Sequence, residues 1–177
     1  MSELPAASAA PSKGPSVAIG AAVYALLGIG LTFLTFRVGG AAMYASLCGL
    51  CLVMLAGPGL AVWHYTSTHR LTLLAGPGAS IGAMTGAAGA LLSGLLTQAL
   101  IAVNLLPDQA EQLEIQRASM IQMGMDPAQV NEAMASAGTG PFSDPWIALV
   151  LSTVIAAALG AAIGAIAASL FKKGDPA

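Results

Sequence analysis

The sequence predicts an all-α fold: an integral membrane four-helix bundle with a two-helix extramembrane loop between the third and fourth spans. Of the 177 residues, 56% are hydrophobic and only 8% are charged, whereas soluble domains carry about 25% charged residues. Four apolar stretches are each long enough for a hydrocarbon core of about 30 Å. No charged residue occurs between positions 71 and 107. A membrane protein is therefore the class that fits.

The first half of the chain predicts a tail and two spans. Residues 1–15 are rich in Ala, Ser and Pro, so we expect a disordered tail before a single transmembrane domain at 16–177. The first span, 17–36, exceeds the roughly 7–15 residues of a signal-peptide core. We therefore favour a retained helix over cleavage near 39–42. The second span is expected at 41–62, followed by a polar-aromatic connector.

The next apolar stretch is too long for one straight span. Residues 71–106 would make roughly 54 Å of helix at about 1.5 Å per residue. The Gly-Pro-Gly at 76–78 offers a break, so we expect an interfacial or re-entrant piece at 71–75 and a span at 79–106. The same Leu-Ala-Gly-Pro-Gly pentamer also occurs at 55–59, which is too short a match to indicate a repeat.

Small residues recur every four positions in the third span and again in the last one. Such rows let two helix backbones approach closely, so we expect the third and fourth spans to pack along them. The rows comprise Gly78, Gly82, Gly86, Ala90 and Gly94 in the third span, and Gly160, Gly164 and Ala168, with Ala157, Ala161 and Ala165 beside them, in the fourth.

The polar segment 107–144 predicts two extramembrane helices. The first is expected at 108–123. The second begins with Asp126 as N-cap and Pro127 in the first helical position, and ends near Ser136. Asp144 caps the last span, 145–171, in the same way.

The basic residues predict the orientation. Four spans place both termini on one side, which carries Lys13, Arg70, Lys172 and Lys173; the other side carries Arg37 and Arg117. The positive-inside rule then places both termini in the cytoplasm.

The residues that could take part in catalysis or metal binding are more simply explained by structural roles. Cys48 and Cys51 have C-x-x-C spacing but lie in a predicted span, where cysteine acts as an apolar filler. We expect His64 and His69 to be solvated in the connector. We assign no catalytic, cofactor-binding or metal-binding residue, and the scattered bases exclude a nucleic-acid interface. The polar residues of the third span are expected to form interhelical hydrogen bonds: Thr85, Ser93, Thr97, Gln98 and Asn104. The acids of the extramembrane segment are expected to form a solvated face: Glu111, Glu114, Asp126 and Glu132.

The order of parts resembles the small bacterial membrane proteins of the domain-of-unknown-function 4199 family. The similarity covers two close spans, a short connector ending at Arg70, a Gly-rich third span, Pro107-Asp108 with a Glu/Gln/Met-rich helical segment, and a last span ending at Lys172-Lys173. The resemblance implies a four-helix protein of the bacterial inner membrane, with no established activity or catalytic residues.

Two functional hypotheses follow. The first is a non-enzymatic accessory or interaction subunit, whose partners are the lipid bilayer and a membrane protein or second copy held through the small-residue seams. The alternative is a small transporter or channel built around Pro-broken second and third helices, because broken helices mark binding sites in transporters. This alternative predicts a polar cavity near Pro58 and Pro77.

Overall fold

The computed structural model describes residues 11–38, 41–137 and 144–172. These residues form six helices: α1 (Gly14–Val38), α2 (Ala41–His69), α3 (Ala75–Ala102), α4 (Gln109–Gln122), α5 (Pro127–Ala137) and α6 (Pro145–Leu170). Helices α1, α2, α3 and α6 contain segments that are long and apolar enough to cross a membrane. The predicted all-α fold, with four candidate spans and a helix pair between the last two, is confirmed.

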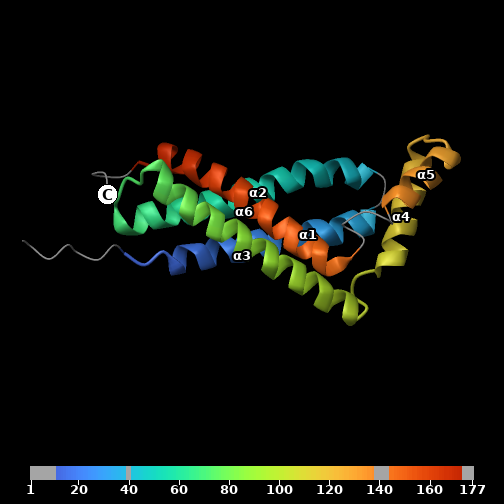
Figure 1. The fold of residues 1–177 in the computed structure, drawn as a ribbon, viewed down its shortest axis with the longest axis horizontal. Helices are drawn as coiled ribbons and strands as arrows, with labels where there is room; N and C mark the ends of the chain where they lie inside the picture. The colour runs from blue at the N-terminus through green and yellow to red at the C-terminus, as the bar shows by residue number, and fades with distance from the viewer. Residues whose placement is uncertain (1–10, 39–40, 138–143, 173–177) are drawn as a thin grey trace, which may run out of the picture.

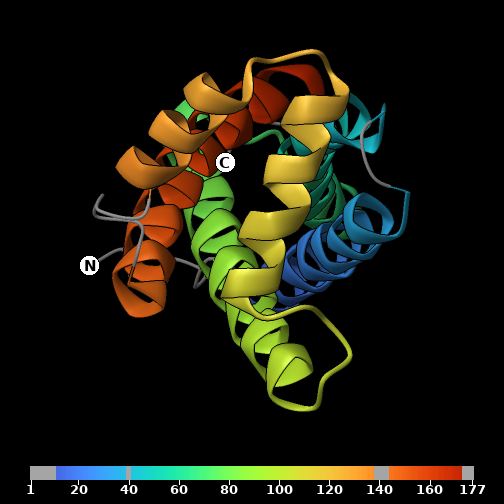
Figure 2. The same ribbon diagram turned by 90° about the vertical axis from the view of Figure 1, so that its right-hand side faces the viewer.

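The four spans alternate in direction along the long axis of the molecule, and α4 and α5 lie together at one end (Figure 1). We call this the loop end. The opposite end holds the start of α1 and α3 and the finish of α2 and α6, together with Lys13, Arg70 and Lys172. We call it the basic end. Seen from the loop end, α4 lies across the end of the bundle (Figure 2).

Helices α3 and α6 make the most extensive pairing in the bundle, and their small-residue rows form it as predicted. A Cβ added to Gly78 would lie 2.6 Å from the carbonyl oxygen of Gly164 and 2.5 Å from the Cβ of Ala168. A Cβ on Gly82 would collide with the backbone of Gly160. Only glycine allows backbones to approach this closely.

The buried core is concentrated toward the basic end and the middle of the bundle. One cluster includes Val62, Tyr65 and Ile81, and a second includes Tyr24 and Val53. Toward the loop end the contact changes from backbone to side chain: a Cβ on Gly94 would overlap the side chain of Leu149, and no backbone atom of α6 lies within 4 Å of it. Helices α3 and α6 therefore cross tightly near the basic end and separate toward α4, as Figure 1 shows.

The second span is longer than predicted. Instead of ending at residue 62, α2 continues to His69, so the expected connector is mostly helix. The prediction was wrong because the polar groups of this segment have partners inside the bundle. The hydroxyl of Tyr65 donates to the Pro11 carbonyl at 3.0 Å, and His64 is hydrogen-bonded to Ser16. Pro58 lies within α2 and is fully buried.

The third span begins earlier and ends earlier than predicted. Helix α3 starts at Ala75 and includes the Gly-Pro-Gly segment in its first turn. Proline is tolerated there because the first N–H groups of a helix have no partner within it. The helix stops at Ala102 because Asn104 adopts a left-handed conformation with φ 57°. The amide of Leu105 then donates to the carbonyl of Leu100, which is a Schellman termination.

The remaining boundaries largely agree with the sequence. Asp108 caps α4 by accepting from the Glu111 amide, Asp126 accepts from the Ala128 amide at the start of α5, and Asp144 accepts from the first two amides of α6. Residues 11–15 of the expected disordered tail are part of the described structure, and α1 begins at Gly14. Residues 1–10 of that tail, residues 39–40 between the first two spans and Lys173 lie outside the described residues.

Candidate functional site: the loop-end cavities

Helix α4 forms one wall of two cavities at the loop end of the spans. The first has a volume of about 300 Å³ and lies between the ends of α1 and α3 and the start of α4. The second, of about 420 Å³, lies between α3 and the start of α6. Among the helices, α4 packs substantially only on α5. The ends of the spans separate beneath α4, and α4 covers the space between them without filling it. The two cavities result from this arrangement.

The first cavity combines opposite charges with aromatic and apolar walls. Helix α1 contributes Arg37 from its last turn, and the start of α4 contributes the carboxylates of Asp108 and Glu111. Within the described residues, none of these three side chains forms an ion pair. The other lining residues are Phe33, Phe36, Ile101, Asn104, Leu105, Leu106, Pro107 and Ile115. We call this the zwitterionic cavity.

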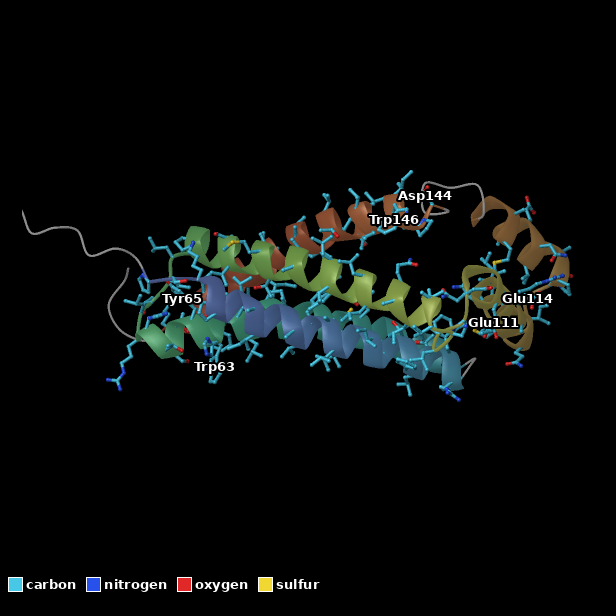
Figure 3. The ribbon with its side chains drawn as sticks, turned by 90° about the horizontal axis from the view of Figure 1, so that it is seen from below. Trp63, Tyr65, Glu111, Glu114, Asp144 and Trp146 are labelled. Atoms are coloured by element: carbon cyan, nitrogen blue, oxygen red, sulfur yellow. The ribbon has the colours of Figure 1, made fainter. Side chains whose placement is uncertain are left out.

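The connection between α3 and α4 holds the carboxylate side of the zwitterionic cavity in place. After the left-handed Asn104, the side chain of Leu106 is only 5% exposed. The side-chain amide of Gln112 donates to the Pro107 carbonyl at 2.8 Å, and Asp108 accepts from the Glu111 amide at 2.9 Å. Buried and hydrogen-bonded groups on both sides of the turn therefore fix the start of α4. Figure 3 shows Glu111 on α4 at this end.

The second cavity is lined by neutral polar and apolar residues. Thr97, Gln98 and Ser152 contribute polar groups from α3 and α6, and Gln112 contributes one from α4. The hydroxyls of Thr97 and Ser152 donate to the carbonyls of Ser93 and Leu149 on their own helices. These groups give the mostly apolar cavity a few polar positions without adding a charged side chain.

The predicted interhelical hydrogen bonds of the polar residues in the third span are not found: among the described residues, none of the five side chains bonds to another helix. Thr85 is fully buried, but its hydroxyl donates to the Ile81 carbonyl one turn earlier in α3. The hydroxyl of Thr97 likewise donates to the Ser93 carbonyl one turn earlier in α3. Sequence alone could not separate these arrangements, because a threonine in a helix can reach either its own backbone or a neighbour. An interhelical bond that sequence reasoning missed joins Lys13 Nζ to Ser80 Oγ at 3.2 Å.

The prediction that both histidines are solvated in a connector was wrong: His64 and His69 lie on α2 and are half-buried. His64 Nδ1 lies 2.9 Å from the hydroxyl of Ser16, which is 2% exposed. The ring of His69 lies against that of Tyr65, with 4.8 Å between centroids. With the Tyr65–Pro11 bond, these contacts tie the start of α1 to the end of α2. Figure 3 shows Tyr65 and Trp63 at this basic end.

The other sequence candidates remain separate. Cys48 and Cys51 are free and exposed on α2, and no group of three metal-ligand side chains occurs within the described ranges. Glu111, Glu114, Asp126 and Glu132 are all exposed, as predicted, and of these four Glu111 also lines the zwitterionic cavity together with the exposed Asp108. The four acids thus form exposed surface, part of which borders the cavity.

The surface beside the buried Pro58 is apolar. A groove of about 490 Å³ runs along α2 there, and its lining includes Leu55, Gly59, Trp63 and Phe171. Pro77, in turn, lies in the first turn of α3 and does not break a helix. The proline-broken helices expected for a transporter are therefore not the arrangement that the structure shows.

An exposed apolar patch lies where α4 turns into α5. Ile121, Met123 and Met125 are 40%, 37% and 40% exposed, and the left-handed Gly124 with φ 86° makes the turn between them. We call these three side chains the junction patch. They lie beyond the apolar spans, in the segment that also contains the charged α4. These side chains are the apolar surface that α4 and α5 offer for contact with another molecule.

Comparisons with protein-family models, with curated proteins and with solved structures found no match.

Proposed function

We propose that this chain is a non-enzymatic accessory or interaction subunit of the membrane, and that the α4–α5 pair is its interaction element. The observation that carries this proposal is the junction patch, which presents three exposed apolar side chains on a helix pair that packs mainly on itself at the end of the bundle. Methionine is flexible and polarisable and adapts to partner surfaces. The partner is a protein with a complementary apolar surface.

The small-residue seam is not the contact surface for this partner. The glycine rows of α3 and α6 face one another within the chain, so contact with a partner or a second copy must use other faces. This finding narrows the interaction surface to α4–α5 and the lipid-exposed sides of the spans. Of these, only α4–α5 lies outside the candidate spans.

Site-specific photocrosslinking in native membranes tests the proposal. A photoreactive residue at Met123 or Met125 is expected to give one common protein adduct, and Ile121→Asp is expected to abolish it. The matched control places the same residue at Ala22, which is exposed on α1. Recovery of only the free monomer at both junction positions, or adducts that survive Ile121→Asp, would count against an interaction subunit.

A small transporter or channel is the alternative, and the cavity between α3 and α6 is the observation that favours it. Transport would need water to pass beyond the glycine crossing, where Thr85 is fully buried. Labelling of Thr85→Cys by a small water-soluble thiol reagent would support this alternative. Reaction of Thr97→Cys with the reagent, together with no reaction of Thr85→Cys, would oppose the transporter alternative.

The proposed location is a bacterial inner membrane, with the basic end in the cytoplasm. Lys13, Arg70 and Lys172 lie at that end, whereas Arg37 and Arg117 lie at the loop end. This distribution supports the orientation through the positive-inside rule. Membership of the domain-of-unknown-function 4199 family also stays a prediction. The order of two close spans, a Gly-rich third span and a helical segment before the last span supports it.

A further inference from the structure

The zwitterionic cavity lies where the spans end and the extramembrane segment begins. Phe33 and Phe36 line it from the last turns of α1, and Ile101 and Leu105 line it from the end of α3. Since α1 and α3 are candidate spans, their ends lie at the depth of the lipid headgroups. The cavity therefore has an apolar side toward the hydrocarbon and a charged side toward α4.

The charged groups occupy separate elements of the cavity wall. Arg37 presents a guanidinium from α1, while Asp108 and Glu111 present carboxylates from α4. Within the described residues they do not pair with one another. A guanidinium is well suited to bind a phosphate, and carboxylates accept hydrogen bonds from an ammonium group. A ligand with both charges would satisfy both walls at once.

The size of the cavity limits the ligand. Its volume of about 300 Å³ is at the lower end of the roughly 300–1,000 Å³ found for small-molecule sites. That space suits a compact headgroup. The flanking Ile101 and Leu105 provide apolar surface along which an acyl chain can continue into the membrane, and Leu105 is 60% exposed.

We propose that the zwitterionic cavity binds the headgroup of a phospholipid that carries a phosphate and a primary ammonium, as in phosphatidylethanolamine. Arg37 binds the phosphate, and Glu111 and Asp108 accept hydrogen bonds from the ammonium. Phe33 and Phe36 supply ring surface that also favours a cation. This inference is independent of the interaction proposed for the junction patch.

The charges distinguish this headgroup from the other common ones. A glycerol headgroup would offer its phosphate to Arg37 in the same way, but it carries no cation for the two carboxylates. A choline headgroup has no N–H donor for the carboxylates, since its nitrogen carries four carbon substituents. The primary ammonium is the group that uses both the charge and the acceptor atoms of Asp108 and Glu111.

Lipid retention by the full-length protein tests the inference. The protein is placed in nanodiscs with equal amounts of phosphatidylethanolamine, phosphatidylcholine and phosphatidylglycerol, released gently, and analysed by native mass spectrometry. We expect retained phosphatidylethanolamine to exceed each of the others about fivefold. Glu111→Gln should remove most of this preference, because it removes a carboxylate that accepts hydrogen bonds from the ammonium. Arg37→Gln should instead lower the retention of all three lipids, since each of them carries the phosphate.

Matched variants separate the site from general surface charge. Arg117→Gln and Glu114→Gln make the same chemical changes on α4 at residues that do not line the cavity, and should keep the preference. Unchanged helical content by circular dichroism confirms that each variant is folded. Equal retention of the three lipids, a preference that survives Glu111→Gln, or unchanged total retention in Arg37→Gln would overturn the inference. Displacement of the lipid by equimolar, water-soluble glycerophosphoethanolamine would also overturn the assignment to a lipid.

Discussion

Gly82 and Gly160 face each other across the crossing of α3 and α6, and a methyl group added to either would overlap the carbonyl oxygen of the other. The relationship is reciprocal, so both helices depend on glycine at the same point. One turn further along each helix, Gly78 and Gly164 make the same reciprocal contact. The crossing is therefore fixed by backbone contact rather than by interlocking side chains.

Replacement of either glycine at this crossing should weaken the fold. Gly82→Ala or Gly160→Ala introduces a carbon where backbone atoms already lie, and the helices must move apart. Overpacking of this kind costs about 1–3 kcal/mol. Reversible unfolding in detergent micelles measures the change. Gly30→Ala is the matched control, since a Cβ there meets nothing within 4 Å; its stability should be equal or slightly higher. Equal losses for Gly30→Ala and Gly82→Ala would contradict the account.

The seam could be predicted because it depends on a helical period alone. Residues four apart lie on one face of a helix, so the rows at 78–94 and 160–168 were visible in the sequence. The separation of the helices near Gly94 and Leu149 was not visible. This separation depends on the crossing angle of α3 and α6 and on the position of α4 across their ends. Neither of these leaves a periodic signal in the sequence.

The hydrogen bond between Tyr65 and Pro11 anchors the start of the chain to the end of α2. Tyr65→Phe removes the donor and should increase hydrogen–deuterium exchange in residues 11–16, with a loss of stability of about 1 kcal/mol. Tyr24→Phe is the control, because the Tyr24 hydroxyl contacts only the Met54 sulfur, at 3.4 Å, a weak acceptor. Unchanged exchange at the start of α1 in Tyr65→Phe would show that the bond does not hold this segment.

The basic end was mispredicted because its partners are distant in sequence. Ser16 and His64 are 48 positions apart, and Tyr65 and Pro11 are 54 apart. Local composition around Trp63 suggested a connector, since polar and aromatic residues often mark the membrane interface. Only the three-dimensional arrangement brings the start of α1 to these groups and allows α2 to continue.

The left-handed Asn104 controls where α3 ends and how α4 is presented. Asn104→Val places a β-branched residue in a conformation that such residues rarely adopt, and should cost about 1–2 kcal/mol locally. Hydrogen–deuterium exchange should rise at Leu105 and through the start of α4. Asn104→Gly removes the steric penalty and should leave exchange unchanged or lower. Similar exchange in the valine and glycine variants would show that the conformation is not required.

Asp144 starts α6 by accepting from the amides of Trp146 and Ile147, at 2.8 and 3.1 Å. Asp144→Ala removes both bonds and should destabilise the start of the helix by about 1 kcal/mol. Asp144→Asn keeps a side-chain acceptor and should stay close to the original stability. Thermal unfolding in detergent, with exchange at residues 146–150, distinguishes the two variants. Equal thermal stability and equal exchange in the Asp144→Ala and Asp144→Asn variants would contradict the capping role of Asp144.

The orientation of the protein can be tested with single cysteines at opposite ends of the bundle. Ser119 would be a natural choice on α4, but it is only 8% exposed, so the exposed Gln116 is better suited. In a background where Cys48 and Cys51 are replaced by alanine, Gln116→Cys should react with a membrane-impermeant maleimide in intact cells. Ser12→Cys, exposed at the basic end, should react only after permeabilisation. The reverse pattern would place the basic end outside and contradict the orientation that the positive-inside rule predicts.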